Sequence, residues 1–494
     1  MNQNLYQAFA EVFSDHPAAP VLHLDDGTVI DYATLDAMSA RYANLLLALG
    51  AETGDRVTVQ CDKSVETLWL YLGTIRAGLV YHPLNNAYQE NELAYFLSNA
   101  APRIVVGDST TLPTLKQLAA ADATVIGVTA LAERATAASD QFQTVTSAAA
   151  DLAALLYSSG TTGVPKGIML THGNLASNAR TLVESWGFTR DDVLLHALPV
   201  FHVHGLFVAL NLALMNGGSV IMLPKFDPDA VLDAMPDSTV MMGVPTYYTR
   251  LLADQRFNRD VSGHMRLFIS GSAPLLVETS DEFFERTGQR ILERYGMTET
   301  GMSCSNPLNG DRRAGSVGPP LPGVEVRIVD ENGAELPRGE IGSLEVRGEH
   351  VFKGYWKLPE KTAAEFKGDW FITGDMATLS DDGYVSIVGR GKDLIISGGL
   401  NIYPKEIEDV LNDQDGVVES AVVGVPHPDF GEGIVAVLVG EQELDMETLQ
   451  AACRGKLAGF KVPRRWIQLD SLPRNTMGKV QKNLLRDDYI ESFK

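Results

Sequence analysis

The segment 157–167 concentrates glycines, hydroxyl groups and a lysine in one loop. It reads Tyr-Ser-Ser-Gly-Thr-Thr-Gly-Val-Pro-Lys-Gly and follows the apolar run 152–156. Glycine adopts backbone conformations that other residues avoid, so such a loop can fold its N–H groups and hydroxyls around a polyphosphate. Its spacing differs from the Walker A motif. The loop indicates a phosphate site of another type, although a flexible surface turn has the same composition.

A second motif, Glu-Arg-Tyr-Gly-Met-Thr-Glu, occupies 293–299. The ring of Tyr295 can stack on a purine, and the carboxylate of Glu299, four residues later, can hold Mg²⁺ against phosphate oxygens. A strand followed by a turn with a surface glutamate has the same pattern. The motif predicts a nucleotide site only in combination with others.

Two further motifs follow, the second of them near the C-terminus. Asp375 follows Thr373 and Gly374, and 389–393 reads Gly-Arg-Gly-Lys-Asp. An aspartate after a glycine turn can bind both hydroxyls of a ribose, although such aspartates also cap turns. Lys479 ends the segment Pro-Arg-Asn-Thr-Met-Gly-Lys. A lone lysine in a basic segment is most often a solvated charge.

The elements that must position these motifs follow an α/β pattern. Short apolar runs alternate with amphipathic stretches, including a helix that Asp31 caps and Gly50 ends. The apolar runs predict buried strands at 57–60, 79–81, 193–195, 220–222, 240–242 and 267–269. The alanine-rich sequence of region 118–153 predicts a helix, a loop and a boundary between subdomains.

The pattern changes after residue 324. Short strands separated by Asn-Gly, Arg-Gly and Asp-Gly turns predict an antiparallel sheet or distorted barrel. From Lys392 a compact α+β unit is expected, with helices near 404–412 and 446–457 and strands at 420–424 and 434–439. These two changes place a domain boundary at Lys392.

Length and charge limit the function. A chain of 494 residues is too long for one core, and its net charge of −23 argues against a nucleic-acid partner. The three cysteines are too far apart in sequence to indicate a disulfide framework or a metal cluster. The sequence has no signal-peptide pattern and no apolar run that spans a bilayer, so we expect a cytoplasmic protein without a membrane partner.

The four motifs, in this order over 32–482, resemble those of the adenylate-forming superfamily of acyl-CoA synthetases, luciferases and peptide-synthetase adenylation domains. The resemblance implies a large N-terminal domain (1–391) of stacked α/β sheets plus a distorted antiparallel β-barrel. It also implies a small mobile α+β C-terminal domain (392–494) that moves about a hinge at Lys392. In the implied reaction a carboxylate attacks the α-phosphate of ATP, and the thiol of coenzyme A then displaces AMP.

The resemblance implies a role for each motif residue. Lys479 would bridge the reacting carboxylate and the α-phosphate, and Thr161 and Glu299 would lie near Mg²⁺. Other implied ATP contacts are Ser158, Ser159, Gly160, Thr162, Gly163, Lys166, Ser272, Ala273, Pro274, Glu293, Arg294, Tyr295, Gly296, Thr298, Asp375 and Arg390. Gly398 and Gly399 would flank the pantetheine thiol, although Leu400 replaces a glutamate common in this loop.

The expected acyl pocket, at 201–206, 243–250 and 270–272, is polar. It contains His202, Ser270, Ser272 and Arg250. Arg250 follows a strand early in a helix, where its guanidinium can grip a second carboxylate, although a surface ion pair is the alternative. His202 is a gate, a hydrogen-bond donor to the acid or a packed core residue.

Segments 196–206, 243–250 and 263–272 resemble those of malonyl-CoA synthetases. The implied substrates are malonate, ATP and coenzyme A, with methylmalonate as a second acid. The alternatives are a CoA ligase for another short-chain or aromatic acid, a stand-alone adenylation enzyme that charges a carrier protein, and a non-catalytic nucleotide-binding relative. The family also suggests regulatory acylation of Lys479.

Overall fold

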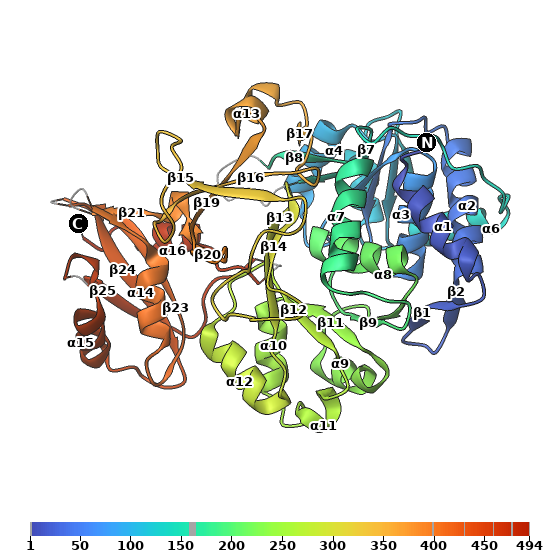
Figure 1. The fold of residues 1–494 in the computed structure, drawn as a ribbon. Coiled ribbons are helices and arrows are strands. Elements are labelled where there is room, and N and C mark those ends of the chain that lie inside the picture. Colours follow the sequence, from blue (N-terminus) through green and yellow to red (C-terminus); the bar gives the residue numbers. More distant parts are fainter. Residues whose placement is uncertain are drawn as a thin grey trace.

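The computed structural model describes residues 2–157, 165–397, 400–428, 430–457, 459–475 and 478–493, arranged around four β-sheets. Figure 1 shows the sheets and helices of the N-terminal half on one side and the C-terminal sheet on the other. The third sheet lies between them. No helix in these ranges is long and apolar enough to cross a membrane.

The first sheet has seven strands and a parallel centre. In spatial order they are β17 (Gly354–Tyr355), β8 (Gly167–Thr171), β7 (Leu152–Tyr157), β4 (Val80–Pro83), β3 (Arg56–Gln60), β5 (Ile104–Gly107) and β6 (Thr124–Gly127). β7, β4, β3, β5 and β6 are parallel, and β8 returns antiparallel beside β7. The phosphate-loop segment therefore connects β7 and β8 at the end of a sheet strand.

The second sheet has eight strands and supplies most site residues. Their order is β14 (Gly301–Ser305), β13 (Leu292–Met297), β12 (Leu267–Ser270), β11 (Val240–Gly243), β9 (Val193–His196), β10 (Ser219–Met222), β1 (Pro20–Leu24) and β2 (Val29–Asp31). β9, β11, β12 and β13 are parallel, so their carboxyl ends meet at one edge, where open α/β sheets bind ligands. The predicted apolar strands on both sheets are confirmed.

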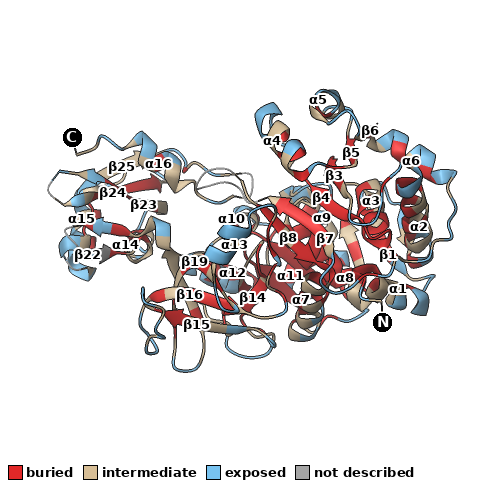
Figure 2. Cartoon of the chain, turned by 90° about the horizontal axis from the view of Figure 1, so that it is seen from above, coloured by how far each residue is buried: buried red, intermediate tan, exposed pale blue. Residues whose placement is uncertain are grey.

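Helices cover these sheets with their apolar sides inward, and Figure 2 shows buried strands beneath partly exposed helices. The predicted cap of α2 (Tyr32–Ala48) is present, because the Asp31 side chain accepts from the Thr34 N–H at 2.7 Å. Region 118–153 contains β6, α6 (Val128–Thr136) and a loop. The remaining helices of this half are α1 (Leu5–Asp15), α3 (Val65–Arg76), α4 (Glu90–Ala100), α5 (Leu112–Leu118), α7 (His172–Ser185), α8 (Asn211–Asn216), α9 (Pro228–Ala234), α10 (Pro245–Leu252), α11 (Arg259–Ser262), α12 (Val277–Thr287) and α13 (Pro359–Ala364), with a π-helix at His204–Leu210.

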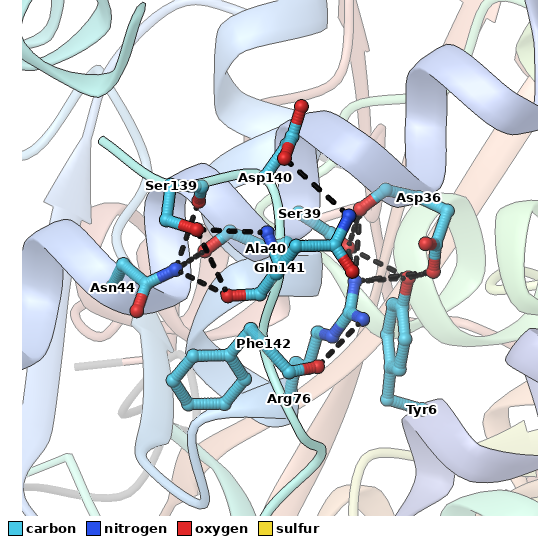
Figure 3. Close-up of polar contacts among 10 residues, drawn as sticks. All are labelled: Tyr6, Asp36, Ser39, Ala40, Asn44, Arg76, Ser139, Asp140, Gln141 and Phe142. Carbon is cyan, nitrogen blue, oxygen red and sulfur yellow. Dashed lines mark hydrogen bonds and ion pairs between the residues drawn. The ribbon is translucent and has the colours of Figure 1, made fainter. Parts of the chain in front are cut away.

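Arg76 joins three of these helices to the loop at 137–145 (Figure 3). From the end of α3, its Nη1 donates to the Asp36 carbonyl at 2.8 Å and to Ser39 Oγ at 2.7 Å on α2. Its Nη2 donates to the Phe142 carbonyl at 2.9 Å, and the Tyr6 hydroxyl of α1 accepts from Nη1 at 3.1 Å. The guanidinium is thus compensated within the fold and has a structural role.

The third sheet is antiparallel, as the turn-rich sequence after residue 324 predicted. Its strands are β15 (Glu325–Val329), β16 (Gly342–Arg347), β19 (Trp370–Leu379) and β18 (Phe366–Lys367), with β20 (Val385–Arg390) also paired to β19. Bridges from Pro320 to Cys304 and from Gly318 to Val385 connect it to β14. These bridges partly close the sheet into the expected distorted barrel around a shared apolar core.

The unit after β20 has its own sheet and cores. Its strands are β22 (Leu400–Ile402), β21 (Ile395–Ser397), β24 (Gly431–Gly440), β23 (Val417–His427) and β25 (Arg465–Leu469), packed with α14 (Pro404–Asn412), α15 (Met446–Lys456) and α16 (Lys482–Asp488). Its two apolar clusters contain only residues from Ile395 onward. The expected α+β organisation is therefore confirmed.

Candidate active site

The lysine of the phosphate-loop motif lies beside a buried acidic network. Lys166 Nζ pairs with Glu365 Oε1 at 3.2 Å and lies 4.2 Å from the centre of the Tyr355 ring. Ser158, Ser159, Gly160, Thr161, Thr162 and Gly163 lie outside the described residues. Their predicted phosphate and magnesium contacts remain predictions.

Glu299 follows β13 and meets the same network. The Tyr355 hydroxyl lies 3.2 Å from Glu299 Oε1 and 2.7 Å from Glu365 Oε2. Glu299 is 7% exposed, and its burial raises the pKa of its carboxyl group. Tyr355 and Glu365 were not predicted, because no local motif marks contacts made across such long stretches of sequence.

The Glu299 carboxylate suits a magnesium site whose other ligands would come from the ATP phosphates. The described residues contain no cluster of three or more His, Cys, Asp or Glu side chains able to hold a metal alone. Magnesium is commonly held by one or two carboxylates together with substrate phosphates and water. Glu299, with few protein partners and an adjacent lysine, matches that requirement.

The second and third motifs meet in space. The Tyr295 hydroxyl donates to Asp375 Oδ2 at 2.5 Å, and Arg390 Nε pairs with Asp375 Oδ1 at 2.9 Å. Asp375 and Arg390 face each other across β19 and β20, and Asp375 is 3% exposed. The structure therefore brings together the tyrosine, aspartate and arginine that were predicted to contact the nucleoside.

Other motif residues lie at the strand ends around this group. A Cβ on Gly296 would lie 2.0 Å from the Gly301 carbonyl oxygen, so the β13–β14 turn needs glycine there. Glu293 is buried, and one of its carboxylate oxygens makes no hydrogen bond to any residue that the structure describes. Thr298 lies in the turn before β14, while Ala273 is half-buried and Pro274 is exposed after β12.

The loop after β12 is strained at Ser272. This residue has a φ of +70°, a left-handed conformation that is costly for a residue with a Cβ. Its hydroxyl lies 3.3 Å from His204 Nδ1. Ser270 precedes it with a fully buried Oγ that has no hydrogen-bond partner. Both predicted serines therefore lie at the carboxyl end of β12, beside the histidine segment.

The histidines after β9 are neutral. Burial, followed by the positive charges of Lys479 and Arg294, lowers the pKa of His202 to about 3. His202 Nδ1 accepts from the His204 backbone N–H at 3.3 Å, which leaves the proton of the neutral ring on Nε2. His202 is half-buried. Its Nε2–H can donate one hydrogen bond, which the predicted role as a donor to the acid requires.

Arg250 is exposed on α10 after β11, but it lies in the last turn of this helix and not on its first turns as predicted, because the helix ends at Leu252. In the described part of the chain no carboxylate forms an ion pair with it. It lies one helical turn after Thr246, on the same face. A Cβ on Gly478 would lie 3.3 Å from Thr246 Oγ1, so this face meets the segment that carries Lys479.

Lys479 reaches the centre of the site from the C-terminal unit. Its side chain remains accessible to solvent, yet desolvation by the surrounding protein, then the charge of Arg390, lowers its pKa to about 8. Asp375, Arg294 and Glu299 also act on its charge. The fourth motif therefore converges with the second and third.

The expected hinge and thiol loop lie at the start of the C-terminal unit. Lys392 is exposed in a short 3₁₀ turn directly after β20, and the next residue, Asp393, pairs with Arg486 of α16 at 2.5 Å. Gly398 and Gly399 lie outside the described residues, between β21 and β22. Their contact with pantetheine remains a prediction.

Comparison with protein families gives two matches. Residues 7–356 match the AMP-binding enzyme family, and residues 406–479 match the AMP-binding enzyme C-terminal domain. Among curated proteins, the chain is 35% identical to malonate–CoA ligase of Arabidopsis thaliana, over 93% of this chain and 85% of that protein. It is 36% identical to feruloyl-CoA synthase of an Amycolatopsis species, over 93% and 94%.

Among solved structures, ATP-bound MatB from Rhodopseudomonas palustris is 54% identical and matches with a TM-score of 0.97. The match covers 100% of both chains. The apo form of the same protein matches with a TM-score of 0.87 over the same coverage. The structure of this chain therefore resembles the ATP-bound form of MatB more closely than its apo form.

Proposed function

The chain belongs to the AMP-binding enzyme family, and we propose that it synthesises malonyl-CoA from malonate, ATP and coenzyme A, releasing AMP and pyrophosphate. The observation that carries the proposal is the position of Lys479. It enters the site from the C-terminal unit and lies within electrostatic reach of Glu299, Asp375 and Arg294. That arrangement suits the union of two anions, a carboxylate and a nucleotide.

In the first half-reaction, Lys479 neutralises charge between the attacking carboxylate oxygen and the α-phosphate. The gain comes from positioning and electrostatic stabilisation, because two anions must meet and negative charge builds up on the phosphate oxygens. Asp375 and Arg390 hold the ribose, and Tyr295 orients the base. Acylation of Lys479 would remove its charge and stop this step.

Glu299 would hold magnesium together with the ATP phosphates, with Thr161 close by. The bound ion would neutralise phosphate charge and orient the pyrophosphate leaving group. Lys166 supports the same phosphates from the other side of Tyr355. The Tyr355 hydroxyl fixes the Glu299 carboxylate, so the network sets where the phosphates can lie.

In the second half-reaction the C-terminal unit (392–494) rotates about Lys392. Rotation withdraws Lys479 and brings Gly398 and Gly399 to the acyl-AMP, where the thiol of coenzyme A displaces AMP. The separate apolar cores on the two sides of Lys392 support such a rigid-body motion.

Malonate is favoured as the acid because cations and hydrogen-bond donors surround the acyl pocket. Arg250 is available on the α10 face that meets the Lys479 segment, and His202 offers a neutral Nε2–H. The relative named malonate–CoA ligase supports this choice. Methylmalonate differs by one methyl group, which discriminates by only about 1–3 kcal/mol, so we propose it as a second substrate.

The test is pyrophosphate release with ATP, Mg²⁺ and coenzyme A across acetate, propionate, malonate, methylmalonate, succinate and 4-coumarate, with the thioester identified by mass spectrometry. We expect malonate to give the highest kcat/KM. A preference for acetate, propionate or 4-coumarate would retain the family reaction and refute the diacid assignment. A carrier-protein enzyme would instead release pyrophosphate without forming any CoA thioester.

A further inference from the structure

Glu365 links the lysine of the phosphate-loop motif to Glu299 through one tyrosine. Its Oε1 pairs with Lys166 Nζ at 3.2 Å, and its Oε2 accepts from the Tyr355 hydroxyl at 2.7 Å. The same hydroxyl lies 3.2 Å from Glu299 Oε1. A phenol has one proton, so the two carboxylates share one donor, and Glu365 has the shorter contact. A change at Glu365 therefore reaches both Lys166 and Glu299.

Backbone contacts hold Glu365 beside the strand that follows the phosphate loop. Tyr355 of β17 pairs with Ile168 of β8 (Figure 1). The Tyr355 N–H donates to Thr362 Oγ1 at 2.9 Å, which ties β17 to α13. After α13 the Glu365 carbonyl accepts from the Ile372 N–H at 2.9 Å, so the chain on both sides of the helix is fixed. The fold thus returns Glu365 to Tyr355 and fixes its direction.

Lys166 lies between the Tyr355 ring and the Glu365 carboxylate. Its Nζ is 4.2 Å from the centre of the ring. The side chains of Lys166 and Glu365 are 24% and 21% exposed, so a ligand can still reach the ammonium group. A lysine on a flexible four-carbon stem has many rotamers, and these two contacts restrict them. A charge that is already ordered binds a ligand at a lower entropic cost.

Glu365 also contacts a second lysine, which provides an internal comparison. Lys361 Nζ lies 2.8 Å from the same Oε1, one helical turn earlier in sequence, and its side chain is 50% exposed. Exposed ion pairs of this kind contribute little to stability. If Glu365 served only to hold α13 in place, the two lysines would be equivalent. Lys166 differs from Lys361, because it comes from the phosphate-loop motif and also contacts Tyr355.

We propose that Glu365 is a positioning residue for adenylate formation. It holds Lys166 and the Tyr355 hydroxyl, and through that hydroxyl Glu299, in the arrangement that receives the β- and γ-phosphates of ATP. The inference rests on the ATP-binding step of the proposed function. Glu365 is itself an anion that phosphates repel, so it acts through Lys166 and Tyr355 and not by touching the nucleotide.

The test is titration calorimetry of Glu365→Gln with ATP and Mg²⁺ in the absence of any acid. The amide keeps the size of the side chain and can still accept from Tyr355, but it removes the charge that holds Lys166. We expect the Kd for ATP to rise about tenfold or more. Lys361→Gln removes the other ion pair of the same carboxylate and should stay within about threefold of the wild type. An equal rise in Lys361→Gln would assign the effect to α13 and overturn the inference.

The second half-reaction separates positioning from a general structural defect. Malonyl-AMP has no β- or γ-phosphate, so Glu365→Gln should convert supplied malonyl-AMP and coenzyme A to malonyl-CoA within about threefold of the wild-type rate. A loss in this step as large as the loss in ATP affinity would overturn the inference. Glu365→Asp keeps the charge and withdraws it by one methylene group, so the Kd for ATP should rise about threefold or more. Wild-type ATP affinity in either Glu365 variant would also overturn it.

A double-mutant cycle with Lys166→Gln tests whether Glu365 acts through Lys166. We expect the double variant to bind ATP about fivefold or more better than the product of the two single losses predicts. Single losses that simply multiply would contradict the inference. A wild-type enzyme that binds ATP but forms no malonyl-CoA would instead refute the proposed function, whatever the Glu365 variants do.

Discussion

At the scale of single residues, the charge of the pocket comes from lysine and arginine. His204 is buried, and burial, followed by the charge of Arg294, lowers its pKa well below the ordinary value. His202 is neutral for the same reason. Both imidazoles can therefore act only through hydrogen bonds, and in the proposed reaction Lys479, Arg250 and Arg294 attract the anions. In a chain with a net charge of −23, anionic substrates must be captured by local cations such as these and not by the overall field.

Glu293 is a buried carboxyl group whose ionised form the fold disfavours. Burial raises the pKa of its carboxyl group from 4.5 to about 7. The folded-state pKa is above the unfolded value, so the stability from the protonated form is fully present below pH 4.5. That stability is lost as pH rises through about 7.

We therefore expect Glu293→Gln to stabilise the protein at pH 8 by up to about 3 kcal/mol and to have little effect at pH 4.5. Chemical denaturation of variant and wild type at both pH values measures the difference. Glu278→Gln, an exposed carboxylate at the start of α12, is the matched control. The same stability gain for Glu293→Gln at both pH values would show that desolvation of the charged form is not the cause.

Some site residues could be predicted from the sequence and others could not. The motif residues Tyr295, Asp375 and Arg390 could be predicted, because each belongs to a short pattern with its own chemistry. Tyr355 and Glu365 could not, because their role depends on contacts with Glu299 and Lys166. Lys166 and Glu365 are 199 positions apart. Arg294 is 3% exposed, and its burial could not be predicted either, because it depends on every neighbour in the fold.

At the scale of elements, the site is built where parallel strands end. The segments after β9, β11, β12 and β13 carry His202, Arg250, Ser272 and Glu299 in turn. Apolar runs predicted β9, β11 and β12, and parallel pairing places their carboxyl ends and that of β13 at one edge. The structure of region 118–153 was the least predictable from the sequence. Its loop is held by long-range contacts to Arg76 and Asn44, which no local pattern encodes.

The predicted hinge at Lys392 is the element whose motion the proposed two-step reaction requires. Proline fixes φ near −65°, so Lys392→Pro restricts the backbone rotation at that position, whereas Lys392→Ala leaves it free. We expect Lys392→Pro to retain ATP–pyrophosphate exchange within about threefold and to slow thioester formation about tenfold or more.

Rapid-quench measurement of each half-reaction checks this prediction, with Lys392→Ala as the control. Thioester formation at the wild-type rate in Lys392→Pro would show that the hinge does not lie at Lys392. Equal loss of both half-reactions would show that the substitution disturbs the docked state as well.

At the scale of the whole molecule, the placement of the C-terminal unit is the one that the proposed adenylation step requires. Gly478 approaches Thr246 of α10, and Lys479 lies among charges from β13 and β19. The higher TM-score with ATP-bound MatB than with its apo form, 0.97 against 0.87, agrees with this arrangement. The sequence predicted an α/β N-terminal part and an α+β C-terminal part, and the boundary at Lys392 stays a prediction. The sequence could not indicate their relative placement, because the few contacts between them are not encoded in any local pattern.

The central claim is that Lys479, in this docked arrangement, serves the first half-reaction alone. The most direct test is malonate-dependent exchange of labelled pyrophosphate into ATP, without coenzyme A, in wild type and Lys479→Ala. We expect the variant to lose exchange by about 100-fold or more, yet to convert supplied malonyl-AMP and coenzyme A to malonyl-CoA at near the wild-type rate. Equal loss of both half-reactions, or undiminished exchange, would contradict the account.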